Sequence, residues 1–436
     1  MKIIEWKTSS PEARRAALAR PAAESRDEVF RRAAGIIAAV RAEGDAAVRR
    51  FTTQFGGASL TELQASPEEF REARASLTAD QIAALERAVA NVTRFHEAQV
   101  SAPLIVETMP GVLCERITRP IDSVGLYVPA GSAPLPSTAI MLAVPARIAG
   151  CKARAIASSP GTDGKLHAAV LVAAELCGVT TVYKMGGAQA IAALAFGTES
   201  VRKVDKIFGP GSAWVTAAKQ IIAADPAGAA IDLPAGPSEV LVIADDSANA
   251  RFVAADLLAQ AEHDAIAQVV LVTDSASFAQ QVIDEVADQV RALSRRDIVA
   301  QSMANSRCIL VADLAAAVTV SNEYAPEHLI IQTRDPRALL AQVSCAGSVF
   351  LGAWSPESMG DYCSGTNHVL PTFGYARSYS GVSLLDYQKR ITVQELSADG
   401  LRALGPTAIT LSGMEGLDAH GNAVKVRLEA LAGGAP

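Results

Sequence analysis

The sequence predicts an α/β fold with two incomplete, Rossmann-like domains in tandem, each built on a parallel sheet. Two long segments carry this prediction, because in each of them apolar strands alternate with stretches of helical periodicity. The first runs from about 122 to 224 and the second from 238 to 355. The length of 436 residues agrees, since one ordinary hydrophobic core does not grow that large. Helical N-terminal and small C-terminal segments complete the expected architecture.

The N-terminal part is expected to be helical from residue 11 to 100. Apolar residues recur at helical spacing in ESRDEVFRRAAGIIAAVRAEGDAAVRRFTTQFG, which stops at Gly56-Gly57, and again in ADQIAALERAVANVTRFHEAQV. From about residue 104 we expect two short strands, LIVETM and VLCERITRP, with a turn at Pro110-Gly111 between them.

The strands of the two alternating segments are recognised as short apolar runs that end at turns. Those of the first segment are DSVGLYV, ARAIAS, TTVYK and VDKIF, and those of the second are EVLVIAD, AQVVLVTDS, SRCILVAD, HLIIQT and AGSVFLG. A helical stretch follows nearly every one of them, so right-handed βαβ crossovers are expected.

The C-terminal part begins with a loop and continues into a tail. Residues 356–382 are rich in Gly, Ser, Pro, Asn and Tyr, which is typical of loops that carry functional residues. The tail from about 383 is expected to be helical with one loop, MEGLDAHGNAV. It is too small to bury a core alone, so it should dock on another domain or subunit.

Composition excludes several classes of protein. The net charge of −7 and the pI near 5.5 argue against nucleic-acid binding, which requires clustered Lys and Arg. No apolar run approaches the roughly 18 residues of a membrane span, and the first 20 residues do not resemble a signal peptide, so a cytoplasmic protein is indicated. The six cysteines form no CxxC pair, which argues against a Cys₄ zinc site and a disulfide framework.

Two glycine turns, Gly186-Gly187 and Gly209-Pro210-Gly211, each follow a strand and open a helix. Such turns let a backbone approach a phosphate closely, and the helix N-terminus offers oriented N–H groups. Neither turn is GxGxxG, so an ordinary dinucleotide fingerprint is absent. Taken alone, the turns fit either an anion site or tight structural turns.

Gln260 and His263 lie three residues apart, on one face of a predicted helix. Asp361 and His420, both in loop-rich stretches, are candidates to join them. Two imidazoles, a carboxylate and an amide oxygen would suit a catalytic zinc ion. The alternative for His263 is an ordinary half-buried histidine, and the sequence alone does not show that these four residues converge.

A Glu327-His328 pair precedes the strand LIIQT, where it can act as general base and proton relay because His titrates near neutrality. A surface pair at the start of a strand is the alternative. Ser238, in a turn after Pro237, is a candidate for substrate binding or for local capping.

Long motifs of this chain resemble those of the histidinol dehydrogenase family along nearly its whole length. They are VGLYVPAGSAPLPST, GGAQAIAALAFGTESV, VDKIFGPG, AIDLPAGPSEVLVIAD, DLLAQAEHD, YAPEHLI, GDYCSGTNHVLPT and QKRITVQELS. The resemblance implies NAD-dependent, zinc-requiring oxidation of L-histidinol to L-histidine, through an enzyme-held histidinal, as the last steps of histidine biosynthesis.

The resemblance also implies roles for particular residues. His328 would remove the alcohol proton, and Glu327 would activate water to attack the aldehyde. It implies one Zn²⁺ per subunit and NAD, and a homodimer in which Glu415 and His420 of the tail reach the partner's site. The implied zinc ligands are Gln260, His263, Asp361 and His420; the implied substrate contacts are these four together with Ser238, His328 and Glu415; the implied NAD contacts are Tyr127, Gln189 and Ser212.

These implications suggest boundaries for the domains. We expect an N-terminal helical segment at 1–24, a zinc and substrate domain formed by 25–126 and 238–382, an NAD-side domain at 127–237, and a tail at 383–436 that docks on the partner subunit.

Three residues on the cofactor side depart from the family pattern. Ser212 stands where Asn is usual, Trp214 where Tyr or Phe is common, and Ala130 where Gly is usual. The residues at the implied metal-ligand and acid–base positions match the family pattern.

Alternatives to histidinol oxidation are a paralogue that oxidises another small amino or hydroxy alcohol, a zinc hydrolase that uses Glu327 and needs no NAD, and a non-catalytic scaffold.

Overall fold

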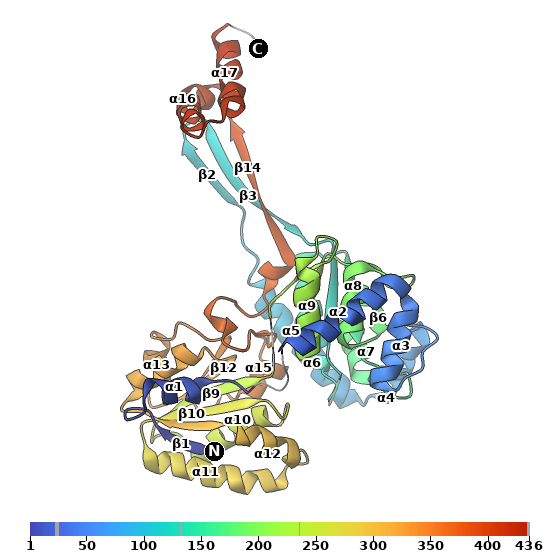
Figure 1. Cartoon of the computed structure of the whole chain (residues 1–436), viewed down its shortest axis with the longest axis vertical. Helices are drawn as coiled ribbons and strands as arrows, with labels where there is room; N and C mark the ends of the chain where they lie inside the picture. The colour runs from blue at the N-terminus through green and yellow to red at the C-terminus, as the bar shows by residue number, and fades with distance from the viewer. Residues whose placement is uncertain (22–25, 131–132, 235, 434–436) are drawn as a thin grey trace. The chain divides into compact units, whose positions relative to one another are not determined.

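The computed structural model describes residues 1–21, 26–130, 133–234 and 236–433, and these form two units (Figure 1). The main unit comprises 1–99 and 121–387, and the second unit comprises 100–120 and 388–436. Each unit therefore combines segments that are far apart in the sequence.

The main unit contains a six-stranded sheet with the order β1-β11-β10-β9-β12-β13, in which every neighbouring pair is parallel. Its strands are buried apolar runs, as in sheets that are covered on both faces. They are β1 (Lys2–Glu5), β9 (Glu239–Ala244), β10 (Gln268–Thr273), β11 (Arg307–Leu310), β12 (His328–Gln332) and β13 (Ser348–Leu351).

Helices cover both faces of this sheet, as Figure 1 shows around β9 and β10. Val240, Val242 and Leu271 pack with the helices of one face, whereas Leu241 and Val270 pack with those of the other, so alternate strand residues serve alternate cores. The first face carries α10 (Ala250–Ala261), α11 (Ala276–Gln289), the short η1 (Val290–Ala292) and α12 (Arg296–Ala304); the second carries α1 (Pro11–Leu18), α13 (Leu314–Tyr324) and α14 (Pro336–Leu340).

A five-stranded parallel sheet with the order β6-β5-β4-β7-β8 forms the second half of the main unit. In both sheets the first strand of the α/β segment lies centrally, the next two extend to one side and the last two to the other. The strands are β4 (Ser123–Val128), β5 (Ala153–Ser158), β6 (Thr181–Lys184), β7 (Lys206–Phe208) and β8 (Ala230–Ile231). Tandem α/β domains with parallel sheets were predicted, and the structure confirms the two parallel sheets with their helices.

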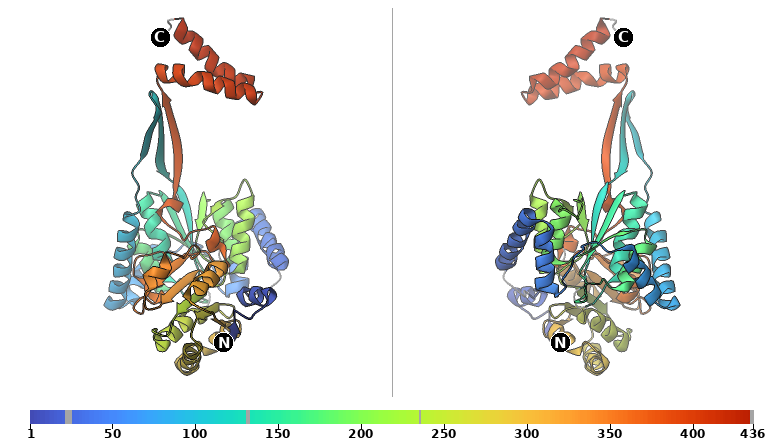
Figure 2. Two further views of the ribbon diagram at one scale, coloured as in Figure 1. Left: turned by 90° about the vertical axis from the view of Figure 1, so that its left-hand side faces the viewer. Right: turned by 90° about the vertical axis from the view of Figure 1, so that its right-hand side faces the viewer.

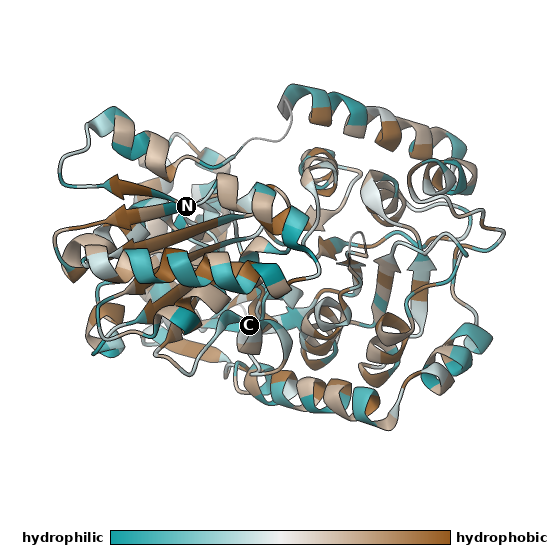
Figure 3. Cartoon of the chain, turned by 90° about the horizontal axis from the view of Figure 1, so that it is seen from below, coloured by the Kyte–Doolittle hydropathy of each residue, from teal (hydrophilic) through white to brown (hydrophobic). Residues whose placement is uncertain are grey.

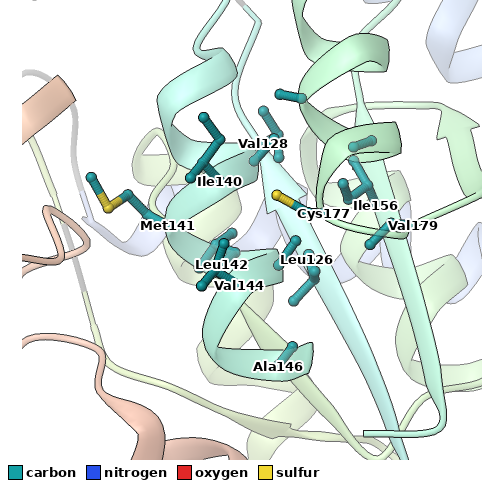
Figure 4. Close-up of a cluster of buried hydrophobic side chains, with 14 of the residues drawn as sticks. Leu126, Val128, Ile140, Met141, Leu142, Val144, Ala146, Ile156, Cys177 and Val179 are labelled. Carbon is teal, nitrogen blue, oxygen red and sulfur yellow. The ribbon is translucent and has the colours of Figure 1, made fainter. Parts of the chain in front are cut away.

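Helices also enclose this second sheet, and Figure 3 shows the apolar strands of the main unit between helical layers. One face is covered by α4 (Pro67–Ser76), α5 (Ala79–Glu97), α6 (Pro136–Ala149) and α7 (Ala168–Leu176). The other is covered by α2 (Arg26–Glu43), α3 (Asp45–Gly56), α8 (Gly187–Phe196) and α9 (Ala213–Ala224). Figure 4 shows the first of these cores, where Ile140 and Leu142 of α6 pack near Leu126 and Val128 of β4.

The helices of 26–97 thus differ from the expected domain division, which grouped 25–126 with the zinc-side domain. Val29, Ala33 and Ile37 pack into the core of the five-stranded sheet instead. An amphipathic helix must bury its apolar face, but its sequence does not state which sheet will cover it. At the N-terminus, β1 also joins the six-stranded sheet, so the segment 1–24 is not purely helical.

The second unit is an antiparallel sheet, β14-β3-β2, followed by two helices (Figure 2). Its strands are β2 (Leu104–Met109), β3 (Val112–Pro120) and β14 (Gln388–Leu396), and its helices are α16 (Ala398–Met414) and α17 (Asp418–Ala432). The two strands expected at 104–120 are confirmed. The helical prediction from 383 is wrong for 388–396, because β14 pairs residue for residue with β3.

The remaining elements connect the site to the fold. They are α15 (Glu357–Tyr362), η2 (Tyr375–Arg377) and η3 (Leu384–Tyr387). Within the described ranges, no helix combines the length and apolar character that a membrane crossing requires.

Candidate active site

Predicted site residues of the six-stranded sheet meet at the amino ends of its central strands. His328 is the first residue of β12, opposite Val240 near the start of β9, and Glu239 is the first residue of β9. The helix α10 runs back across β9 and β10, which brings Gln260 and His263 to the same end. Parallel sheets more often bind ligands at their carboxyl ends, so this location is unusual.

His328 is buried among carboxylates. Its Nε2 lies 3.4 Å from Asp361 Oδ1, and its Nδ1 lies 3.6 Å from Glu327 Oε2 and 3.9 Å from Glu357 Oε2. Burial by itself disfavours the imidazolium, but Glu357, Glu327 and Asp361 together raise the pKa of His328 well above its usual value. A cation held by these carboxylates would offset their effect on the imidazole.

Glu327 is held by the backbone beside it. Its Oε2 accepts a hydrogen bond from the N–H of Glu239 at 2.9 Å. Burial raises the pKa of Glu327 to about 8, while His328 and the Glu239 N–H oppose that rise. A carboxyl with such a pKa is suited to exchange protons near neutral pH.

Three potential metal ligands converge next to this pair. Ligand atoms of His263, Glu357 and Asp361 all lie within 4.8 Å of one another. Burial lowers the pKa of His263, although Asp361 opposes the change, so a neutral imidazole with a free lone pair is favoured. Nitrogen and carboxylate oxygen donors are ligands that zinc accepts, and the set therefore fits a divalent ion.

Gln260, also predicted as a zinc ligand, is fully buried in the same place. With its amide nitrogen facing acceptors, it donates to Glu357 Oε1 and accepts from the Glu239 N–H at 3.0 Å. In this orientation the amide oxygen is the atom that lies 3.3 Å from His328 Nδ1. Gln260 thus joins the acid–base pair to the ligand cluster.

Glu357 and His368 are residues of the site that the predicted ligand and catalytic sets did not include. Glu357 precedes Asp361 by four residues on α15, and that spacing places two carboxylates on one helix face. This spacing is the sequence pattern that could have indicated Glu357 as a site residue. His368 Nε2 is buried without a hydrogen-bond partner, and burial lowers the pKa of His368 while the nearby Asp361 opposes the change.

The other predicted substrate contacts lie in two places. Ser238 immediately precedes β9, so it lies beside Glu239 in the main unit, and its carbonyl accepts from the N–H of Gln268 at 3.2 Å. Glu415 caps the end of α16 and His420 lies in the first turn of α17, both exposed in the second unit. These two are therefore not among the groups assembled within the main unit.

A cavity of about 910 Å³ lies at the carboxyl ends of strands β4 to β7 in the five-stranded sheet. Gln189 and Ser212, two of the predicted NAD contacts, line it. Gln189 Oε1 is buried and lacks a hydrogen-bond partner, so it is available to a ligand donor. The other lining side chains include Arg32, Phe51, Phe55, Ser159 and Trp214.

Tyr127, the third predicted NAD contact, is buried under this region and does not line the cavity among the described residues. Its hydroxyl accepts a hydrogen bond from the N–H of Gly187 at 3.0 Å. Tyr127 therefore contacts the glycine turn, and its role toward a cofactor stays a prediction.

The turn at Gly209 is also bonded within the protein. Its N–H donates to Asp232 Oδ2 at 2.7 Å, and its carbonyl accepts from Lys219 Nζ at 2.9 Å. Lys219 and Asp232 form a buried ion pair with each other. The Gly187 and Gly209 N–H groups thus already have protein partners, and Ser212, the N-cap of α9, is the residue of this turn region that is exposed in the cavity.

The fold and site define an α/β protein with two parallel sheets, in which a buried Glu–His pair lies beside a candidate metal site. Comparison with known proteins gives matches to one family along nearly the whole chain. The family model described as histidinol dehydrogenase matches residues 19–428. The histidinol dehydrogenase of Vibrio vulnificus is 53% identical over 431 residues, which are 99% of each chain. That of Xanthomonas oryzae pv. oryzae is 55% identical over 432 residues, covering 98% of this chain and 99% of the relative.

A solved structure agrees with the sequence comparison. The crystal structure of histidinol dehydrogenase from Elizabethkingia anophelis matches with a TM-score of 0.94 at 44% identity, and the match covers 99% of both chains. The chain belongs to the histidinol dehydrogenase family and is an oxidoreductase. The family resemblance stated from its motifs is confirmed.

Proposed function

We propose that this enzyme oxidises L-histidinol to L-histidine with NAD, in two steps through histidinal that stays bound. The observation that carries the proposal is the buried Glu327–His328 pair beside the His263, Glu357 and Asp361 cluster, in a chain of this family. Relatives of the same length are named for histidinol oxidation, which gives the substrate.

His328 is the proposed base of the first oxidation. Its Nε2 faces Asp361 Oδ1 at 3.4 Å, on the side of the ligand cluster, and is the proposed acceptor of the hydroxyl proton of the alcohol. The carbinol carbon then loses a hydride and becomes an aldehyde carbon. Burial of the site keeps water from the reacting atoms until the second step.

Glu327 is the proposed base of the second oxidation. As a carboxylate it takes one proton from a water molecule while the water oxygen bonds to the aldehyde carbon. The resulting hydrate loses the second hydride and becomes the carboxylic acid. With a pKa of about 8, the Glu327 carboxylate is a stronger base than that of an ordinary glutamate.

The residues that would hold zinc are Gln260, His263 and Asp361 of one subunit and His420 of a second copy. Zinc would supply a fixed positive charge that anchors the amino and imidazole nitrogens of histidinol. Glu357 lies close enough to support these ligands, since its Oε1 accepts from Gln260. Ser238 and Glu415 are the further proposed substrate contacts.

The proposed NAD site is the cavity beside Gln189 and Ser212. NAD would accept one hydride in each step. The unpartnered Gln189 Oε1 and the apolar walls formed by Phe51, Phe55 and Trp214 support a large, partly aromatic ligand there.

A homodimer completes this proposal. The second unit leaves many large apolar side chains exposed, and Val112 is its one buried hydrophobic side chain among the described residues. A surface of this kind is typical of one covered by another chain. The exposed side chains include Ile105, Val106, Ile391, Leu411 and Met414.

Steady-state turnover tests the proposed function. Zinc-loaded enzyme should release two NADH for each histidine formed from L-histidinol, and removal of zinc by a chelator should abolish turnover until zinc is restored. A mixture without NAD is the control. Zinc-loaded enzyme that forms no NADH from histidinol, or that consumes histidinol without NAD, would contradict the proposal.

A further inference from the structure

An ion pair lies behind the acid–base pair and takes no part in the proposed reaction. Arg20, which follows α1, donates from Nε to Glu239 Oε2 at 2.7 Å. The side chains are 14% and 2% exposed, respectively, so the pair is withdrawn from water. Burial raises the pKa of Glu239, and the guanidinium opposes that rise, so without Arg20 the carboxylate would lack its counter-ion.

The guanidinium of Arg20 makes further contacts with the segment that leads into the acid–base pair. Its Nη2 donates to the carbonyls of Tyr324 at 2.8 Å and Ala325 at 3.4 Å, and its plane lies over the Tyr324 ring at 4.0 Å. Only a planar fork of donors can make these contacts together, and the point charge of a lysine cannot.

The same ion pair holds two unusual backbone conformations. Ala325 (φ 54°) and Phe373 (φ 56°) are the non-glycine residues with a left-handed backbone in the described part of the chain. The Ala325 carbonyl accepts from Arg20, and the Phe373 N–H donates to Glu239 Oε1. Strained conformations persist where surrounding contacts fix them, and here both contacts come from one ion pair.

Glu239 connects this network to the reacting groups through its backbone. Its N–H donates to Glu327 Oε2 at 2.9 Å, and its carbonyl lies 3.3 Å from His328 Nδ1. Ala325 is also separated from Glu327 by Pro326 alone. The pair thus acts on Glu327 and His328 from two directions, through β9 and through the turn before β12.

We propose that the Arg20–Glu239 ion pair is a positioning device that sets the orientation of Glu327 and His328 for proton transfer. The proposal rests on the proposed function, in which these two residues are the bases. Arg20 and Glu239 are positioning residues because they act through the backbone that the bases contact.

The experiment compares full-length, zinc-loaded Arg20→Lys with wild type. We expect kcat to fall about 10- to 100-fold, the effect of a base displaced by a fraction of an ångström to an ångström. KM for histidinol should stay within about twofold, and the zinc content should not change, because Arg20 itself contacts none of the proposed zinc ligands. Arg14→Lys is the matched control: Arg14 belongs to α1, donates to the Trp6 carbonyl at 3.0 Å and lies over the Trp6 ring at 5.2 Å. It should retain wild-type kcat.

A double variant, Arg20→Met with Glu239→Gln, separates positioning from charge balance. Removing both charges avoids an unpaired buried ion, so the thermal midpoint should recover relative to either single variant. Under the proposal kcat stays low, and a crystal structure of the double variant shows the contact of 2.9 Å from Glu239 N to Glu327 Oε2 lengthened beyond hydrogen-bonding distance.

Results that contradict the positioning role differ from results that contradict the proposed function. Wild-type kcat in Arg20→Lys, or recovery of both stability and kcat in the double variant, would overturn the positioning role. Absence of histidinol turnover in wild type and Arg14→Lys would contradict the proposed function instead. In that case the distance in the crystal structure of the double variant decides the present proposal, because its measurement requires no activity.

Discussion

The pKa values of His328 and Glu327 are both raised, but by different causes. Both are buried, which favours a neutral glutamic acid and a neutral imidazole. Burial prevails at Glu327, whose pKa rises to about 8, whereas three carboxylates prevail at His328 and raise its pKa. Under the proposed function, each of these two buried groups serves one of the two proton transfers.

Glu327→Gln separates the two steps. The amide keeps the size of the side chain and can stay near the Glu239 N–H, but it cannot take a proton from water. We expect oxidation of histidinol to histidinal to continue within about threefold of wild type and conversion of histidinal to histidine to fall about 10²- to 10⁴-fold. Single-turnover assays started from histidinol and from histidinal measure the two steps. Equal loss of both would exclude the water-activating role.

Asp256 is a buried carboxyl in α10, and it lies outside the proposed reaction. Its Oδ2 accepts from Gln332 Nε2 at 2.7 Å, and burial raises its pKa to about 7. Because the unfolded chain releases this proton near pH 4, the folded state becomes relatively less stable as the pH rises from 4 to 7. Gln332 Oε1, in addition, has no hydrogen-bond partner.

We therefore expect Asp256→Asn to stabilise the protein. The amide removes the buried charge and can donate to Gln332 Oε1. The gain in the free energy of unfolding should be on the order of 2–4 kcal/mol at pH 8 and shrink to about half or less at pH 5. Urea denaturation at both pH values measures it. Asp246→Asn, which alters an exposed ion pair with Arg334, is the control, and an equal gain at both pH values would refute the assignment.

Apart from the added strand β1, the two sheets have the same strand order, but their candidate site residues lie at opposite ends of the strands. In the five-stranded sheet the cavity lies at the carboxyl ends of the strands, the usual position in doubly wound folds. In the six-stranded sheet Glu239 and His328 begin their strands, and the end of α10 supplies Gln260 and His263. One topology therefore provides two different kinds of site.

Gly209→Ala tests the glycine turn of the cofactor side. Gly209 has φ 121°, and an added Cβ would collide with the carbonyl oxygen of Tyr127, so the turn must shift. Since the turn leads into Ser212, we expect KM for NAD to rise about tenfold or more, with zinc content unchanged. NAD titration at saturating histidinol measures this. Gly433→Ala, whose Cβ would meet only ordinary contacts at the end of α17, should have no effect, and an unchanged KM in Gly209→Ala would show that the turn does not position the cofactor.

Local periodicity was sufficient to predict most elements of the main unit. Runs such as that of β9 are continuously apolar, and the helices between them bury one or both faces. The strand β14 was missed because QKRITVQEL mixes charged and apolar residues and its partner β3 is remote in sequence. The sheet covered by α2 to α5 was assigned wrongly for a similar reason, since packing partners depend on the whole fold.

For the candidate site, the motifs included the Glu327–His328 pair, two residues of the ligand cluster and the cavity residues Gln189 and Ser212, whose roles stay predictions. They did not identify Glu357, which has no unusual neighbour in the sequence except Asp361 four residues later. Nor did they indicate Arg20, whose partner Glu239 joins it only after the N-terminal segment packs against the six-stranded sheet. Burial and charge at these positions arise from the tertiary structure.

At the scale of the whole molecule, the proposed dimer implies active sites shared between subunits. His420 and Glu415 belong to the second unit, whereas His263 and Asp361 belong to the main unit. Mixing His263→Ala and His420→Ala subunits tests this, because each mixed dimer would contain one site with both defects and one intact site.

After unfolding and refolding of an equal mixture, we expect about a quarter of wild-type activity, since half of the dimers are mixed and each has one intact site. Each variant refolded alone should stay inactive, and wild type refolded in parallel gives the reference. If the mixture stays as inactive as its components, the two residues serve the same subunit or the assignment of His420 is wrong.

The pairing of β14 with β3 also has a consequence for biosynthesis. The hairpin of β2 and β3 leaves the ribosome early, but the strand that completes its sheet is near the end of the chain. Until β14 arrives, one edge of β3 has unpaired backbone groups beside apolar residues, an arrangement that invites aggregation. The strand β3 carries charged side chains, namely Glu115, Arg116 and Arg119. Charges on an unpaired edge strand discourage pairing with other chains. The sheet can therefore be completed only after the more than 260 residues between β3 and β14 have been synthesised.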